Sequence, residues 1–262
     1  MTFLVSIFIF VLGLAVGSFL NVCIHRIPRK ESITKPASHC PQCGHPLRIF
    51  DNIPLLSYFL LKGKCRYCGK PISIQYPLVE LLTALLFLAV FAKYGIGWKT
   101  PVAIVFASVL FLSGAIDIKH KIIPNKVIFP AFGIGFLLLF VKALGGADFL
   151  PLVGASRSVF YPLLGLVLGG GILFVPALIK EDWMGAGDVK FTALMGLFLG
   201  GYVLLALFFG SLIGSIVGVT LILLKKLQRR ETIPFGPFLA LGALITLFFG
   251  PEIFSFYQSF WV

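Results

Sequence analysis

The chain has 262 residues, of which 58% are hydrophobic and only 12% are charged. Soluble domains carry about 25% charged residues, so this composition all but excludes a soluble globular enzyme and predicts an all-α polytopic membrane protein. The net charge of +12 could suggest a nucleic-acid partner, but nine of the 22 Lys and Arg residues gather in residues 26–70. That clustering is typical of a cytoplasmic loop, so we expect a lipid bilayer and no nucleic acid as the partner.

Residues 1–25 contain no Lys, Arg, Asp or Glu. A spanning helix takes about 20 mainly apolar residues, so this stretch is long enough to cross a bilayer. A cleavable signal peptide would carry its positive charge before the apolar run, whereas here Arg26, Arg29 and Lys30 follow it. We therefore expect a first transmembrane helix at 1–25 with the N-terminus outside.

The next segment, residues 26–75, is rich in Pro, Gly and Cys. It is too short to bury much of a core, so a domain here needs disulfides or a metal ion. Two CxxC pairs, Cys40 with Cys43 and Cys65 with Cys68, could place four thiolates around zinc. Two disulfides are the alternative, but thiols stay reduced in the cytoplasm. We expect a cytoplasmic loop domain bound to structural zinc, with no open metal position for substrate.

Further stretches poor in charge lie at residues 77–94, 100–116, 127–143, 158–179, 191–224 and 232–251. The stretch 191–224 would be about 51 Å long as one helix, too long for a single span, and Gly200-Gly201 is a suitable turn. We therefore expect about eight transmembrane helices, with a membrane domain over 76–262. With the N-terminus outside, eighteen of the 22 Lys and Arg residues fall on the cytoplasmic side, as the positive-inside rule requires.

Three of the ten acidic residues lie within or at the edge of apolar segments, namely Glu80, Asp117 and Asp188. Ionisable groups are costly to bury in a membrane and tend to mark functional sites. Asp117 ends the third predicted span and Asp188 opens the sixth, which places both at the inner boundary. Two adjacent carboxyl groups can share one proton, as in an aspartic protease. The alternative for each is a helix-end ion pair, with Lys119 or Lys190.

Two glycines, Gly185 and Gly187, come just before Asp188. Glycine allows a substrate backbone to approach closely, which would suit a protease site. Ordinary packing between membrane helices is the alternative explanation, because small residues are common there. The pattern by itself leaves both interpretations open.

Together these motifs resemble those of type IV prepilin peptidases, also called bifunctional prepilin leader peptidases. The resemblance covers nearly the whole chain. Its motifs follow in the expected order: 17–28, both CxxC pairs, 51–54, 76–80, 185–190 and 233–239. In one departure, many relatives have Asp where this chain has Asn125, which puts in doubt any substrate-side role for that position.

The resemblance implies a GxGD-type aspartic endopeptidase with Asp117 and Asp188 as the catalytic pair, supported by Gly185, Gly187 and Lys190. Such an enzyme removes the basic leader of prepilins and pseudopilins at the cytoplasmic face of the inner membrane. It would also N-methylate the new N-terminal residue with S-adenosylmethionine.

For methyl transfer, the resemblance alone suggests contributions from the zinc-bearing loop and from Glu80 as a cofactor-binding residue. A Glu inside an apolar helix could bind an ammonium group or the new amine of the substrate, but Glu80 could equally pair with Arg26 or Lys93. The chain has no Rossmann-type glycine fingerprint that would point to a donor site. A proton-coupled transporter is one alternative function, but it would carry acids near the middle of its spans. A scaffold of a pilus or secretion machine without catalysis is another, and the intact aspartate motifs argue against it. The sequence does not decide the oligomeric state.

Overall fold

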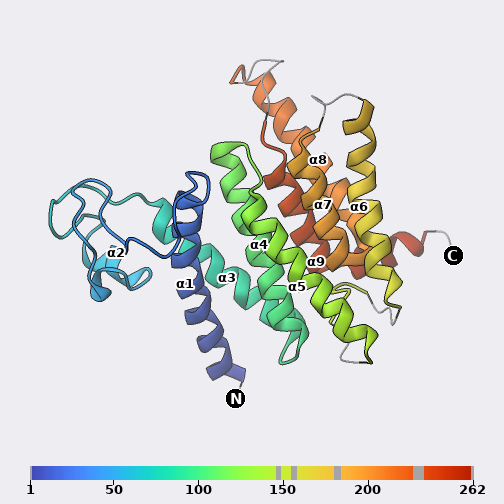
Figure 1. The fold of residues 1–262 in the computed structure, drawn as a ribbon, viewed down its shortest axis with the longest axis horizontal. Helices are drawn as coiled ribbons and strands as arrows, with labels where there is room; N and C mark the ends of the chain where they lie inside the picture. Colours follow the sequence, from blue (N-terminus) through green and yellow to red (C-terminus); the bar gives the residue numbers. More distant parts are fainter. Residues whose placement is uncertain (1, 146–148, 155–157, 180–183, 227–232, 261–262) are drawn as a thin grey trace. The chain divides into compact units, whose positions relative to one another are not determined.

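The computed structural model describes residues 2–145, 149–154, 158–179, 184–226 and 233–260 (Figure 1). Within these ranges the chain is helical, and its only β-type pairings are two isolated bridges. The all-α prediction is therefore confirmed. The chain divides into two compact units, Met1–Ile96 and Gly97–Val262.

The N-terminal unit consists of α1 (Thr2–Arg26), the short helices η1 (Ile49–Asp51) and α2 (Leu56–Leu60), and α3 (Gln75–Tyr94). Helices α1 and α3 pack against each other through glycines. A Cβ on Gly13 would lie 2.6 Å from the Cα of Ala84, and one on Gly17 would lie 2.7 Å from the Cα of Glu80. Small residues four apart let membrane helices approach closely, and here they bring Glu80 against α1.

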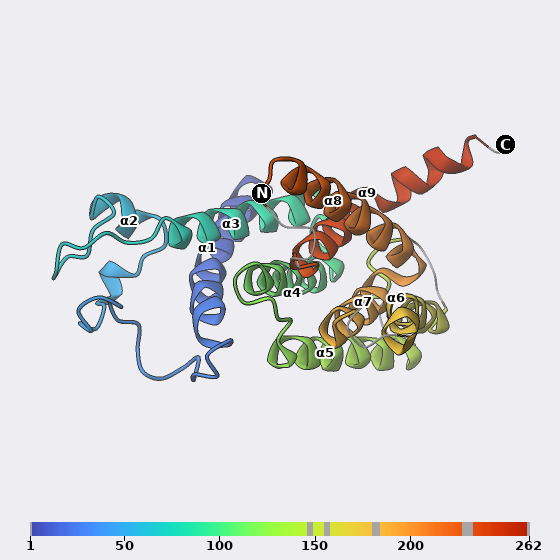
Figure 2. The same cartoon turned by 90° about the horizontal axis from the view of Figure 1, so that it is seen from above.

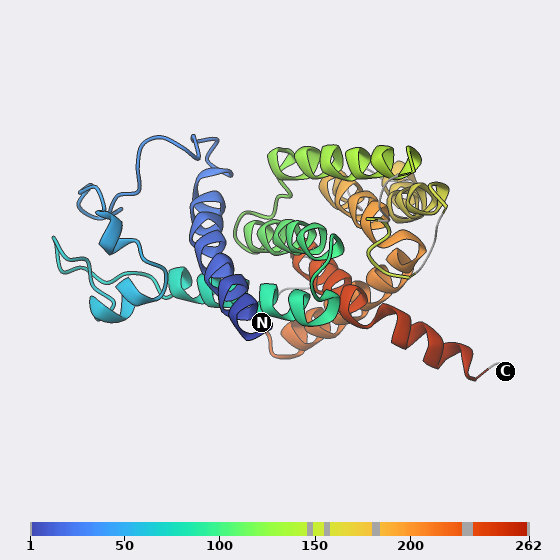
Figure 3. The same ribbon diagram turned by 90° about the horizontal axis from the view of Figure 1, so that it is seen from below.

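The described part of the C-terminal unit has six long helices and one short one. They are α4 (Lys99–His120), α5 (Asn125–Ala143), α6 (Phe160–Ile179), α7 (Ala186–Leu199), η2 (Gly200–Tyr202), α8 (Val203–Leu223) and α9 (Gly236–Gln258). Helix α6 lies beside α7, and α9 packs against both α8 and α4 (Figure 2). The end of α9 extends away from the other helices of this unit, and most of its residues beyond Pro251 are exposed (Figure 3).

Glycines also fix α7 in place. A Cβ on Gly165 of α6 would collide with the backbone oxygen of Gly196 in α7, and a Cβ on Gly169 would collide with that of Thr192. On the other side of α7, the ring of Phe198 stacks on Phe106 of α4 at a centroid distance of 4.8 Å. Helix α7 is therefore closely packed on two sides, and its first turn belongs to a firmly held helix.

Among the described residues, seven helical segments are long and apolar enough to cross a membrane, and one of them, Ala186–Leu223, has 38 residues. It contains α7, η2 and α8, so the prediction of about eight helices is confirmed. Gly200 ends α7 with a left-handed φ of 63°, at the turn predicted from the sequence. Large apolar side chains such as Leu137 and Phe174 face outward, as lipid contact requires. The protein is a multi-pass membrane protein.

Candidate functional site

The side chain of Asp117 lies in the last turn of α4 and is only 5% exposed. Helix α4 ends just beyond it. There Lys121 adopts a left-handed conformation and donates its backbone N–H to the backbone carbonyl oxygen of Asp117. The Oδ2 atom of Asp117 accepts a hydrogen bond of 2.9 Å from the backbone N–H of Gly236. Since Gly236 is the first residue of α9, the carboxylate lies at the positive end of that helix.

Only glycine leaves room for this contact at position 236. A Cβ there would lie 2.7 Å from Oδ2 of Asp117. One turn earlier in α4, a Cβ on Gly114 would lie 3.4 Å from the Cα of Pro237. The close approach of α4 to the start of α9 therefore depends on the glycine at position 236, whereas a Cβ at position 114 would make an ordinary van der Waals contact.

The second predicted aspartate, Asp188, lies in the first turn of α7 and is half-buried. Its charge lies close enough to interact electrostatically with that of Asp117. Gly185 caps α7 with an extended backbone, and its oxygen accepts the N–H of Asp188 at 3.0 Å. A Cβ on Gly185 would lie 3.0 Å from Oδ2 of Asp188. The two aspartates predicted from the sequence, one from α4 and one from α7, thus lie within range of each other's charge.

The other two predicted supporting residues contact the segment that leads into α5. A Cβ on Gly187 would lie 3.2 Å from the Cβ of Ile123, so this glycine allows close packing. Lys190 donates to Oδ1 of Asn125 at 3.3 Å, and its Nζ lies 5.7 Å from the ring centre of Phe129. In the described ranges Lys190 forms no ion pair with Asp188, so it ties α7 to the start of α5.

The four predicted zinc ligands also lie together. The sulfur atoms of Cys40, Cys43, Cys65 and Cys68 are all within 4.8 Å of one another. The sulfurs of Cys40 and Cys68 are 4.0 Å apart, and a tetrahedral zinc site with bonds of about 2.3 Å separates its sulfurs by about 3.8 Å. None of the thiols forms a disulfide. The cluster is compatible with zinc.

The two CxxC turns share one backbone pattern. Gly44 donates its N–H to the oxygen of Cys40, and Cys40 donates its own to the oxygen of His45, both at 2.9 Å. The same two bonds recur around Cys65 and Gly69. Both glycines are left-handed, with φ of 72° and 69°, which explains why each CxxC is followed by glycine. The two CxxC turns therefore direct their four sulfur atoms toward a common point.

The thiols of this cluster do not ionise alike. Burial would raise the pKa of Cys40, but hydrogen bonds from the backbone of Gln42 and Cys43 and from neighbouring thiols lower it to about 7. The backbone of Lys70 lowers the pKa of Cys68, but burial and the three other thiols outweigh it and raise that pKa to about 11. A nearby cation is therefore needed for all four thiols to be thiolates at once. A divalent metal would supply that charge.

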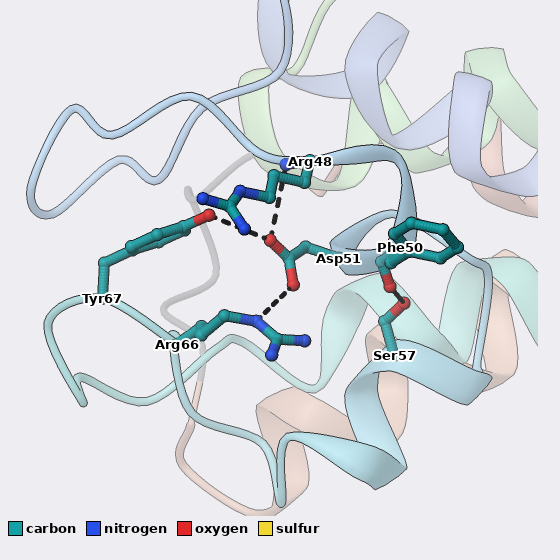
Figure 4. Close-up of polar contacts among 6 residues, drawn as sticks. All are labelled: Arg48, Phe50, Asp51, Ser57, Arg66 and Tyr67. Carbon is teal, nitrogen blue, oxygen red and sulfur yellow. Dashed lines mark hydrogen bonds and ion pairs between the residues drawn. The ribbon is translucent and has the colours of Figure 1, made fainter.

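A buried carboxylate joins the two halves of the loop (Figure 4). Oδ1 of Asp51 accepts a hydrogen bond of 2.7 Å from Nε of Arg66, and Oδ2 accepts bonds of 3.4 Å from the hydroxyl of Tyr67 and the backbone N–H of Arg48. Burial would raise the pKa of Asp51, but Arg66 holds it below its usual value. In the sequence, Asp51 was noted only as part of a motif. In the structure, its carboxylate links the two halves of the loop through hydrogen bonds.

We expect Asp51→Asn to increase amide hydrogen exchange in residues 26–75 about threefold at pH 7, because half-exposed Arg66 loses its partner. The carboxylate stabilises the fold at pH values above its unfolded pKa of about 3.9, and this stabilisation is lost as the pH falls through the lower folded pKa. Arg66→Gln should give the same increase, and the double variant no more. Arg48→Gln is the control, since Arg48 contributes only its backbone. Additive effects of Asp51→Asn and Arg66→Gln would contradict the link.

The predicted cofactor-binding residue, Glu80, is 7% exposed. Its Oε2 accepts a hydrogen bond of 2.8 Å from the backbone N–H of Leu55, and its carboxylate also accepts one from the side chain of Ser18. Glu80 thereby ties α3 to α1 and to the start of α2. It also lines a cavity of about 300 Å³ within the N-terminal unit.

Comparisons with known proteins match both parts of the chain. Residues 11–94 match the bacterial peptidase A24 N-terminal domain, and residues 104–219 match the type IV leader peptidase family. A prepilin leader peptidase/N-methyltransferase of Bacillus subtilis (strain 168) is 38% identical over 95% of this chain and 96% of its own. Proteins of the same name from Aeromonas hydrophila and Pseudomonas aeruginosa are 36% and 35% identical, over 96% and 95% of this chain and 93% and 92% of theirs. No solved structure matches. The chain belongs to the type IV leader peptidase family.

Proposed function

We propose that this protein removes the leader peptide of prepilins and pseudopilins and then methylates the new N-terminal amine. The family and the names of its relatives support this function. Within the structure, the observation that carries it is the pair formed by Asp117 and Asp188, which come from helices far apart in sequence and lie close enough for their charges to interact. A transporter or an inactive scaffold would not need such a pair.

In the proposed cleavage, one aspartate of the pair is ionised and the other protonated. The ionised one takes a proton from water as the water oxygen attacks the scissile carbonyl carbon. The protonated one donates a hydrogen bond to the carbonyl oxygen. The C–N bond then breaks and the departing amine takes up a proton. Because Gly236 holds Oδ2 of Asp117, the Oδ1 atom of Asp117 is left for water or for Asp188.

The substrate suits a site at a membrane boundary. A prepilin has a charged leader followed by an apolar helix, so its scissile bond lies where lipid gives way to water. The excess of Lys and Arg in alternate loops supports an N-terminus outside and an active site at the cytoplasmic face of the inner membrane. We place the first transmembrane helix at 1–25, the cytoplasmic zinc domain at 26–75 and the membrane peptidase domain at 76–262.

The zinc we propose is structural and is held by Cys40, Cys43, Cys65 and Cys68. Four sulfur ligands close the coordination shell, so the ion stabilises the loop and does not act on substrate. When bound, S-adenosylmethionine supplies a methyl group activated by positively charged sulfur. The cavity beside Glu80 is at the lower end of the range of about 300–1,000 Å³ for small-molecule sites. Glu80 lines it and could there accept a hydrogen bond from the substrate amine.

Gly236→Ala is expected to lower the cleavage rate by about 10- to 100-fold, because the new Cβ would displace the carboxylate of Asp117 and a misplacement of about 1 Å can cost about 10²-fold. Gly133→Ala in α5 is the matched control, since a Cβ there meets nothing within 4 Å. Initial rates of leader removal measure both variants. Equal rates for the two would show that the start of α9 does not position Asp117.

The experiment that tests the function is cleavage of a prepilin by the purified protein in detergent micelles. Micelles have no separate compartments, so a transporter would show no activity in them, whereas a peptidase should release the leader. An unchanged prepilin would count against the proposed peptidase.

A further inference from the structure

The cavity in the N-terminal unit is bounded by one face of α1, the start of α3 and the zinc loop. From α1 it receives Ser18, Asn21, Val22, His25 and Arg26. These positions are spaced by three and four residues, so they lie on one side of the helix. The cavity is thus built against regular structure as well as against the loop.

The charged residues that line this cavity are Arg26, Glu31, Asp51, Arg66 and Glu80. Asp51 and Arg66 pair with each other, which leaves one cation and two carboxylates. Arg26 is 8% exposed and donates to the backbone oxygen of Ser32 at 3.0 Å, but it forms no ion pair in the part of the chain that the structure describes. A guanidinium has five N–H donors, so Arg26 keeps several for a ligand.

Asn21 adds a buried acceptor to the same face. It is 3% exposed, and its Nδ2 donates to the backbone oxygen of Tyr76 at 3.0 Å, which fixes the orientation of the amide. Its Oδ1 is buried and finds no hydrogen-bond partner among the described residues. A buried polar atom without a partner is unusual in a protein interior and calls for a ligand that supplies the missing donor.

We propose that Arg26 and Asn21 bind the α-amino-acid end of the methyl donor, the carboxylate at Arg26 and the ammonium at Oδ1 of Asn21, on the Glu80 side of the cavity. This rests on the proposed methyltransferase function. Arg26 and Asn21 lie five residues apart, at the two edges of the α1 face that lines the cavity, so a ligand between them can meet both side chains. A peptide N-terminus offers the ammonium but no carboxylate, so the arginine favours the donor over the cleaved substrate.

The test compares the affinity of the full-length protein for S-adenosylhomocysteine and for 5′-methylthioadenosine, which lacks the amino-acid end, by titration calorimetry. Arg26→Gln should weaken binding of S-adenosylhomocysteine at least about tenfold, the loss expected for a charge-assisted hydrogen bond. It should leave the affinity for methylthioadenosine within about twofold. Asn21→Ala should show the same selective loss. Arg29→Gln, an exposed neighbour outside the cavity, is the control and should change neither affinity.

Equal weakening of both nucleosides by Arg26→Gln and Asn21→Ala would overturn the proposal, because it would mean that these residues only support the fold. Unchanged affinity for S-adenosylhomocysteine in both variants would overturn it as well. Either result leaves the proposed function standing if the wild-type protein methylates a cleaved pilin. A wild-type protein that binds S-adenosylhomocysteine but transfers no methyl group would instead refute the proposed methyl transfer and leave the binding assignment intact.

Discussion

Asp117→Asn and Asp188→Asn are each expected to lower the rate of prepilin cleavage at least about 10³-fold. An amide can neither take a proton from water nor share one with the remaining carboxyl group. The loss should be as large for either single variant as for the double variant, because the residues of a catalytic unit are strongly non-additive. The measurement is the initial rate of leader removal in detergent.

The matched control for these variants is Glu252→Gln, which makes the same kind of exchange at an exposed carboxylate near the other end of the C-terminal unit. It should cleave like the wild type. Both aspartate variants should still methylate a synthetic mature pilin that already has a free N-terminus. Cleavage within about tenfold of the wild type in either variant would remove that aspartate from the mechanism.

Cys40→Ser and Cys65→Ser should each abolish binding of the single zinc ion and unfold the loop between residues 26 and 75. Structural zinc contributes about 10–16 kcal/mol of binding free energy in small domains, which a loop of this size cannot replace. Metal analysis should find one zinc per wild-type chain and almost none in the variants. Added protease should cut the loop at least about tenfold faster. Methylation should fall before cleavage, because the cavity is lined by loop residues.

Cys23→Ala serves as the control for the zinc variants. Cys23 is a buried thiol of α1 outside the cluster, so its removal should leave the zinc content unchanged. Full zinc content in Cys40→Ser would contradict the proposed ligand set. Equal loss of methylation and cleavage in the variants would show that the loop also orders the peptidase site.

Most of the fold could be predicted because a bilayer imposes long apolar helices. A break within residues 191–224 was predictable from length, since no single helix of that size fits a bilayer, and the glycine pair predicted its position at Gly200. The ends of helices were harder to place. The sequence predicts the last span to end at residue 251, but α9 runs through Pro251 to Gln258, because the end of an apolar stretch marks the membrane and not the end of the helix.

The candidate site was predictable where chemistry requires particular residues at particular spacings. The cysteine pairs and the two aspartates belong to this kind. The sequence did not reveal that the backbone of Gly236 holds Asp117, because a backbone donor leaves no signature beyond the glycine itself. It also did not reveal that Asn125 accepts a hydrogen bond from Lys190, since these residues are 65 positions apart. The unpartnered oxygen of Asn21 likewise becomes visible only once α1 and α3 are packed together.

The central claim, that this chain is a prepilin peptidase that also methylates its product, is tested most directly by the intact mass of a prepilin after incubation with the purified protein and S-adenosylmethionine. The Bacillus subtilis relative, run in parallel, is the positive control. The account predicts loss of the leader and a gain of one methyl group on the mature chain. A prepilin whose mass stays unchanged, while the relative processes it under the same conditions, would contradict the account.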